Sequence, residues 1–129
     1  MRISASVLVL MIFTTAALAG ESTVPVMYGQ QSELDACTSQ GVVQKLDPKR
    51  DNFLAMRAGP GAKFKILAKL KSGQKVAMCD SKSGWLGIVV FPTENDLCGT
   101  NTSLDKPAAY SGPCQSGWVS KKYILQVSG

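Results

Sequence analysis

Residues 54–73 read LAMRAGPGAKFKILAKLKSG, and this segment indicates the fold class. Its second half alternates between apolar and lysine side chains with a period of two, which is typical of a half-buried β-strand. Leu67 interrupts the alternation and indicates either a bulge or a second packing contact at that point. A helix is not expected, because Ser72-Gly73 follows early and the lysines would surround the helix. The alternating residues are Phe64, Ile66, Ala68 and Leu70 on one face and Lys63, Lys65, Lys69 and Lys71 on the other.

The first half of the segment predicts a strand that ends in a sharp reversal. Leu54 and Met56 are two residues apart, so their side chains share one face and are expected inside the domain. Gly59-Pro60-Gly61 follows, and glycines that tolerate a positive φ beside a fixed proline φ predict a tight turn. Arg57 points to the other face, where it would either bind loop carbonyls, the favoured role, or meet a ligand.

Short apolar runs separated by Gly, Pro, Asp and Ser continue on both sides of this segment. They predict an all-β domain, either a small barrel or a sandwich. One helical turn is expected around Ser120–Tyr123. The expected strands are at residues 41–43, 53–57, 63–71, 76–79, 85–91 and 117–119.

The N-terminus has the three parts of a secretory signal peptide. Met1-Arg2 is positively charged, residues 7–13 form a short apolar run, and Ala17-Leu18-Ala19 is a small-x-small cleavage pattern. A membrane anchor fits less well, because a spanning helix needs about 20 apolar residues. We therefore predict a signal peptide at residues 1–19, a loose N-terminal arm at residues 20–40, and no integral membrane association after cleavage.

Four cysteines remain after the predicted cleavage, and an even number in an exported chain indicates two disulfides. A zinc site is not expected, because the chain has no His and no Cys-x-x-Cys pair. Four cysteines allow three pairings. We favour Cys98–Cys114, which would close an irregular segment at residues 92–116, together with Cys37–Cys79, which would tie the N-terminal arm to the β domain.

The formal net charge is +5, and the excess is local. Such a patch favours anionic partners, or it is a solvated strand face that keeps a sheet edge from aggregating. The expected export argues against nucleic acid. Ten basic residues lie between positions 45 and 82: Lys45, Lys49, Arg50, Arg57, Lys63, Lys65, Lys69, Lys71, Lys75 and Lys82.

The sequence does not predict an enzyme. The absence of His removes the most common general base and every Ser-His-Asp or Cys-His arrangement. The glycine-rich turn at residues 57–61 is neither a phosphate-binding loop nor a dinucleotide fingerprint. No cofactor and no metal are expected.

The order of these residues resembles a known family. The stretch at residues 54–61 is similar to the L-x-V-R-x-G-P-G signature of bacterial SH3 (SH3b) domains, with Met56 in place of the usual Val. The resemblance covers about residues 41–125. Further matching positions follow in order: Phe64, Leu67, residues 70–76, Gly84-Trp85, Gly117-Trp118-Val119 and Tyr123-Ile124.

The resemblance implies a small SH3-like barrel of five to six short strands at residues 41–129. One departure stands out, because SH3b domains have only a short hairpin where this chain has residues 92–116. That insertion is rich in Pro, Gly, Asn, Ser and Thr and is bracketed by Cys98 and Cys114. Long loops in compact domains are usually functional or disordered, so the insertion is either a recognition loop or a decoration held by its bridge.

The resemblance also implies a function, a non-catalytic exported binding module for cell-envelope material. The ligand would be a peptidoglycan peptide or a segment of an envelope protein, and the location periplasmic or secreted in a bacterium. We expect a shallow groove between the loop at residues 52–61 and the insertion. Phe64, Trp85 and Tyr110 would offer apolar faces, and Arg57 or the lysines would meet carboxylates.

Two other functions stay open. One is a structural or interaction subunit, or an inhibitor, of an envelope protein complex that uses the disulfide-closed loop as its interface. The other is a binder of anionic surfaces that uses the basic residues between positions 45 and 82. For Trp85, packing at the core or rim competes with ligand contact.

Overall fold

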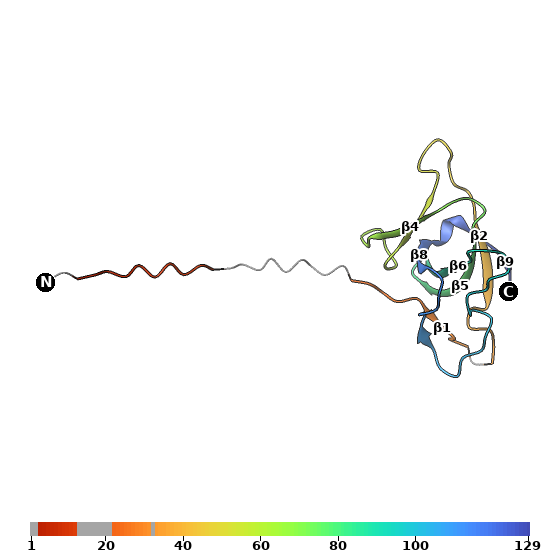
Figure 1. The fold of residues 1–129 in the computed structure, drawn as a ribbon. Coiled ribbons are helices and arrows are strands. Elements are labelled where there is room, and N and C mark those ends of the chain that lie inside the picture. The colour runs from red at the N-terminus through yellow and green to blue at the C-terminus, as the bar shows by residue number, and fades with distance from the viewer. Residues whose placement is uncertain (1–2, 13–21, 32) are drawn as a thin grey trace.

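The computed structural model describes residues 3–12, 22–31 and 33–129. The predicted cleavage site before Gly20 lies outside these ranges. Residues 3–12 have no regular secondary structure and are exposed to solvent (Figure 1). No helix in the described ranges is both long enough and apolar enough to cross a membrane.

The regular secondary structure of the described chain is almost entirely β-strand, as expected (Figure 1). Seven strands form one sheet in the order β4-β3-β8-β6-β5-β2-β9, and β1 pairs with β7 in a small second sheet. The main sheet has more strands than the five to six expected, because the chain continues into β9 after the predicted helical turn. The elements are β1 Met27–Tyr28, β2 Ser39–Val43, β3 Leu54–Arg57, β4 Ile66–Leu70, β5 Lys75–Lys82, β6 Trp85–Val90, β7 Ala108–Ala109, β8 Ser116–Ser120, the 3-10 turn η1 Lys121–Tyr123 and β9 Ile124–Ser128.

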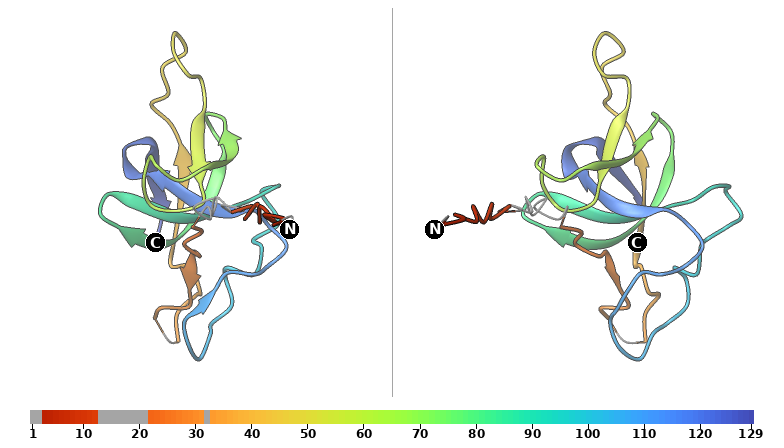
Figure 2. Two further views of the ribbon diagram at one scale, coloured as in Figure 1. Left: turned by 90° about the vertical axis from the view of Figure 1, so that its left-hand side faces the viewer. Right: turned by 60° about the vertical axis from the view of Figure 1, so that its left-hand side comes forward.

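The main sheet curls around an apolar core (Figure 2). Alternate residues of the strands point toward this core, as the two-residue period of a strand requires. Parts of β5, β6 and β8 are also buried on the opposite face. Leu54 and Met56 are both buried, as their spacing predicted. The core consists of Val43, Leu54, Met56, Leu70, Val76, Leu86, Ile88 and Val119.

The hairpin between β3 and β4 contains a bulge, which was one of the two alternatives at Leu67. Met56 is opposite Ala68 and Arg57 is opposite Ile66, so Leu67 is an additional residue in β4. An additional residue reverses the alternation of faces beyond it. The predicted single apolar face therefore holds for Leu70 but is wrong for Ile66, which is 43% exposed.

The turn between these strands also differs from the prediction. Neither Gly59 nor Gly61 has a positive φ. Gly59 is needed for a different reason, because a Cβ there would lie 2.5 Å from the ring of Phe64. The ring of Phe64 packs on the bare backbone of Gly59 and closes the hairpin.

A second part of the molecule lies at the end of the domain opposite the 45–52 loop (Figure 2). We call it the disulfide lobe, and it consists of residues 22–31 and 33–38 together with residues 92–115. It contains the β1–β7 sheet, and its Cys37 and Cys98 form an apolar cluster with Ala77, Val89 and Phe91 of the main sheet and its end. Both expected disulfides are present, Cys37–Cys79 and Cys98–Cys114.

The expectation of a loose N-terminal arm is wrong for its described residues. Val26 is 3% exposed, and the backbone N–H of Tyr110 donates to its carbonyl at 2.8 Å. The carbonyl of Val24 accepts a 2.8 Å hydrogen bond from Nε1 of Trp118. A Cβ at Gly87 would lie 3.0 Å from Val26, so this glycine lets the segment lie flat on the outer face of the sheet.

Candidate functional site

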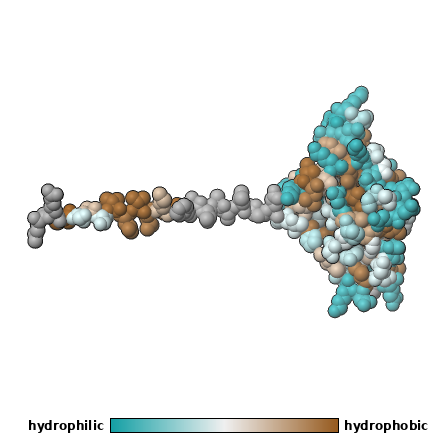
Figure 3. Space-filling view, in the orientation of Figure 1, coloured by the Kyte–Doolittle hydropathy of each residue, from teal (hydrophilic) through white to brown (hydrophobic). Residues whose placement is uncertain are grey.

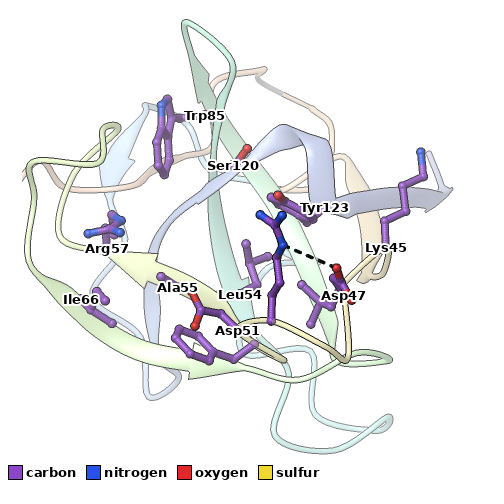
Figure 4. A pocket seen from close by; sticks show the side chains of 13 residues that line it. Lys45, Asp47, Asp51, Leu54, Ala55, Arg57, Ile66, Trp85, Ser120 and Tyr123 are labelled. Carbon is purple, nitrogen blue, oxygen red and sulfur yellow. Dashed lines mark ion pairs between the residues drawn. The ribbon is translucent and has the colours of Figure 1, made fainter.

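The main pocket lies on the curled sheet, away from the disulfide lobe. It has a volume of about 460 Å³ and lies between the loop at residues 45–53, strand β3, the start of β6 and the turn η1 (Figure 4). Leu54 belongs to the apolar core, and Leu46 and Tyr123 pack against it, so these walls of the pocket are joined to the core. Its lining residues are Lys45, Leu46, Asp47, Arg50, Asp51, Phe53, Leu54, Ala55, Arg57, Ile66, Trp85, Ser120 and Tyr123.

Three aromatic residues give the pocket apolar surfaces. Trp85 is the first residue of β6 and Tyr123 is the last residue of η1, and both are partly exposed (Figure 4). Phe53 precedes β3, and the Nζ atom of Lys69 lies 4.7 Å from the centre of its ring. Partly exposed rings on a rigid sheet can pack against an incoming ligand at a small entropic cost.

Charged side chains of both signs surround these rings. Nε of Arg50 lies 3.8 Å from a carboxylate oxygen of Asp47, and both side chains are largely exposed. An exposed ion pair of this kind contributes little to stability. Both groups can therefore change partners at small cost when a ligand enters, and Lys45 and Asp51 lie at the same pocket.

Arg57 has the structural role that the sequence favoured. Its Nη1 donates to the carbonyls of Phe64 at 2.9 Å and Ala62 at 3.1 Å, and it thereby fixes the hairpin after β3. The side chain also lines the pocket beside Ile66. A ligand would meet a guanidinium that is already held in position.

Trp85 and Arg57 are the two predicted ligand-binding residues that the structure brings together in this pocket. Phe64 does not line it, because its ring packs on Gly59 with Nζ of Lys63 5.4 Å from its centre. Tyr110 lies in the disulfide lobe. The predicted groove between the 52–61 loop and the insertion is therefore wrong, and the loop at residues 45–53 and Tyr123 form the second wall instead.

Tyr110 holds the closed loop together. Its hydroxyl donates to the carbonyl of Cys98 at 2.8 Å and accepts from the backbone N–H of Cys114 at 3.4 Å. Its ring meets Tyr28 edge to face at 5.2 Å between centres. Burial raises the pKa of the Tyr110 phenol above its ordinary value. The residue thus joins the insertion to the N-terminal segment.

Sequence reasoning missed several pocket residues, including Phe53, Arg50 and Tyr123. Their common signal is position, because Phe53 and Tyr123 are end residues of a predicted strand and a predicted turn, and Arg50 lies in the loop before that strand. Partly exposed aromatic and charged residues at strand ends are common in binding sites on β-sheets. That pattern is present in this sequence, but it does not show which strand ends lie next to one another in the folded protein.

Among the described residues, one group has the spacing of metal ligands: Asp96 with Cys98 and Cys114. The two sulfur atoms are joined in a disulfide. Thiolates, not disulfide sulfurs, are the metal ligands of cysteine. The group therefore does not form a metal site while the bridge is intact.

Comparisons with protein-family models, with curated proteins and with solved structures give no match for this chain. The two disulfides indicate an oxidising environment outside the cytosol.

Proposed function

We propose that this protein is a non-catalytic exported binding module of the bacterial SH3-like kind that holds cell-envelope material in the pocket at Trp85. The observation that carries the proposal is the composition of the pocket. Three aromatic residues and charges of both signs line one hollow on a disulfide-stabilised sheet. A rigid hollow with a few polar groups is the usual form of a ligand site.

The chemistry of the pocket suits a peptide. The rings of Phe53, Trp85 and Tyr123 would pack against its side chains, and Arg57 would attract its carboxylates. Asp47 and Asp51 would attract amino groups. Cell-wall peptides and segments of envelope proteins carry both kinds of charge, and they are the ligands we propose.

Export is part of the same proposal. The signal-peptide pattern at residues 1–19 and the two disulfides together support a periplasmic or secreted location in a bacterium. The absence of His from the whole chain supports a binding role over catalysis.

The test is sedimentation of the mature protein with purified sacculi. We expect the protein to sediment with them and the Trp85→Ala variant to lose at least tenfold in affinity, because the variant removes the largest ring of the pocket. The control is Leu125→Ala, which changes a 46% exposed apolar side chain on β9 outside the pocket. If neither sacculi nor soluble envelope proteins bind, or if both variants bind like the original, the proposal is wrong.

A second candidate function uses the disulfide lobe as a protein interface, so that the chain is a subunit or an inhibitor of an envelope complex. The observation in its favour is the rigidity of the lobe. Two disulfides and the Tyr28–Tyr110 contact hold loops that would otherwise be free to move. Pull-downs from envelope extract with the protein and with Leu34→Ala test it, because Leu34 is an apolar lobe side chain with 49% exposure. A partner lost with Leu34→Ala but kept with Trp85→Ala would support this function.

A further inference from the structure

Strand β4 is one of the two free edges of the main sheet. It pairs with β3 on one side, and no other strand of the described chain pairs with its far side. A free edge presents backbone N–H and C=O groups that can pair with another extended segment. The question is which groups of β4 point outward and what chemistry surrounds them.

The register shows that Ile66 is one of the outward residues. The backbone N–H of Ala58 donates to the carbonyl of Lys65, so these two residues form a hydrogen-bonded pair. Pairs alternate along an antiparallel ladder between hydrogen-bonded and non-hydrogen-bonded. Arg57 and Ile66 are the next pair and are therefore not hydrogen-bonded to each other, and Arg57 instead pairs with Trp118 of β8. The N–H and C=O groups of Ile66 must point away from β3.

Lys69 is outward for the same reason. It lies opposite Ala55, which is two residues before Arg57 in β3 and so faces β8 as well. Ile66 and Lys69 therefore offer two sets of backbone donors and acceptors on the open side of β4. A bulge at Leu67 separates them.

Lysine side chains line this edge, and two of them are held in place. Nζ of Lys69 lies 4.7 Å from the centre of the Phe53 ring, and Nζ of Lys63 lies 5.4 Å from the centre of the Phe64 ring. Such contacts orient an ammonium without neutralising it. Lys71 adds a third exposed ammonium just after the strand.

Apolar side chains lie between the lysines. Ile66 and Leu67 are each 43% exposed because of the bulge. In Figure 3, apolar atoms reach the surface where β4 lies in Figure 1, next to strongly hydrophilic residues. The other free edge, β9, reads ILQVS and has no charged residue in the strand. The two edges of the sheet thus differ in charge.

We propose that the β4 edge is a second binding surface that takes an extended acidic protein segment as an added strand. The backbone groups of Ile66 and Lys69 would supply the hydrogen bonds. Lys63, Lys69 and Lys71 would pair with carboxylates on alternate residues of the segment, and Ile66 and Leu67 would cover the apolar residues between them. Strand addition of this kind derives affinity from the main chain and specificity from alternate side chains.

The observations favour an extended peptide over an anionic lipid surface. A lipid surface needs only the ammonium groups, whereas this edge also has free backbone groups in register with them. Ile66 borders the Trp85 pocket as well as the edge. A segment on β4 would therefore run past the pocket, but its binding does not depend on the proposed pocket ligand.

The test uses an eight-residue synthetic peptide with Glu at every second position and Val or Thr between, added to the mature protein with both disulfides intact. We expect saturable shifts of the backbone amide NMR signals of Ile66 and Lys69, with the β9 amides unchanged. A peptide with Lys in place of Glu should not bind. Two further Glu peptides are N-methylated at every second residue, one at the odd positions and the other at the even positions. Only one of the two should lose at least fivefold in affinity, because only one set of N–H groups faces β4.

Two variants separate strand addition from general charge attraction. Ile66→Pro removes an outward N–H without removing a bond to β3, and proline is tolerated on edge strands at such positions. It should lower the affinity at least fivefold at unchanged net charge. Lys69→Glu/Lys71→Glu should abolish binding, whereas the matched variant Lys121→Glu/Lys122→Glu changes the same charge on η1 and should have a smaller effect. Circular dichroism checks that each variant is folded.

Several results would overturn the inference. The Glu peptide does not bind, or it binds Ile66→Pro as tightly as the original protein. The two double-lysine variants lose the same affinity for the Glu peptide, or the protein binds only anionic phosphatidylglycerol vesicles. Failure of this inference differs from failure of the pocket proposal. Trp85→Ala should keep the affinity for the Glu peptide. Lys71→Glu, which changes a residue outside the pocket, should weaken binding of the Glu peptide but keep sedimentation with sacculi.

Discussion

Trp85 and Trp118 lie on the neighbouring strands β6 and β8, but they have different surroundings. Trp118 is 0% exposed and donates a hydrogen bond from Nε1 to the carbonyl of Val24. Trp85 is partly exposed and lines the pocket. One ring therefore stabilises the fold, and the other is available to a ligand.

This difference gives a prediction for stability. Trp118→Phe loses the 2.8 Å hydrogen bond to Val24, leaves that carbonyl unpaired and opens a space in a packed layer. We expect the free energy of unfolding to fall by about 2–4 kcal/mol. Urea unfolding followed by circular dichroism measures it. Trp85→Phe is the matched control and should change the free energy of unfolding by less than about 1 kcal/mol, and an equal loss in both variants would contradict the assignment.

Tyr110 gives a prediction for pH dependence. Burial raises the pKa of its phenol in the folded state above the ordinary value near 10. The folded state therefore holds this proton more tightly than the unfolded state. The resulting stabilisation is present below pH 10 and is lost as the pH rises through the folded pKa.

The variant Tyr110→Phe should lose less stability than the original protein as the pH rises above about 10. At pH 7 it should be less stable by about 0.5–1.5 kcal/mol, because the hydroxyl bonds to Cys98 and Cys114 are gone. Denaturant unfolding of both proteins at pH 7 and at several values above pH 10 measures the two effects. Parallel alkaline losses in the two proteins would show that Tyr110 does not contribute.

At the scale of elements, the β3–β4 hairpin shows how far sequence patterns reach. The period of two in residues 63–71 predicted a strand, and the break at Leu67 left its bulge as one of two alternatives. The buried face beyond the bulge was wrong, because one additional residue exchanges the faces. A sequence shows where the alternation of apolar and polar residues breaks. Packing decides on which side of the break the apolar residues face the core.

The N-terminal segment was missed for a different reason. Strand β1 has only two residues, and its partner β7 lies at residues 108–109 in the insertion. Neither has a pattern of its own, and both are held by partners that are distant in the sequence, such as Asp80, which accepts a hydrogen bond from the backbone N–H of Met27 at 3.1 Å. Short strands whose pairing is this distant in sequence leave no local signal.

The N-terminal segment should therefore be necessary for a stable fold. A chain that begins at Gly29 lacks the Val24 carbonyl and the buried Val26, so the Trp118 ring becomes exposed. We expect a loss of about 2–5 kcal/mol in the free energy of unfolding and a red shift of the Trp emission. A chain that begins at Ser22 is the control and should match the original mature protein. Unchanged emission in the shorter chain would contradict the structural role.

The two disulfides are predicted to differ in how much each contributes to the free energy of unfolding. Cys37 and Cys79 are separated by 42 residues and Cys98 and Cys114 by 16. Loop-closure entropy predicts that replacing the first pair by alanine costs about 4 kcal/mol and replacing the second about 3 kcal/mol. Thermal or urea unfolding of the two double variants tests the order, and a larger cost for the Cys98–Cys114 pair would show that loop length does not dominate.

At the scale of the whole molecule, the loop at residues 45–53, which forms one wall of the pocket, and the disulfide lobe lie at opposite ends of the domain (Figure 2). The all-β class and the long disulfide-closed loop could be predicted, because alternation and cysteine count are local features. The pocket could be predicted only in part. Arg57 and Trp85 stood out by motif, whereas the 45–53 loop and Tyr123 meet them only through the curvature of the sheet.

The most direct measurement for the proposed function is an amide and indole NMR titration of the mature, oxidised protein with soluble peptidoglycan fragments. A binding module that uses the pocket predicts saturable shifts at the Trp85 indole, Arg57 and Tyr123, with no change at the buried Trp118 indole or in residues 98–114. The proposed function would be contradicted by shifts confined to residues 92–116. It would also be contradicted if the protein sediments with sacculi but an excess of peptidoglycan fragments causes no shifts.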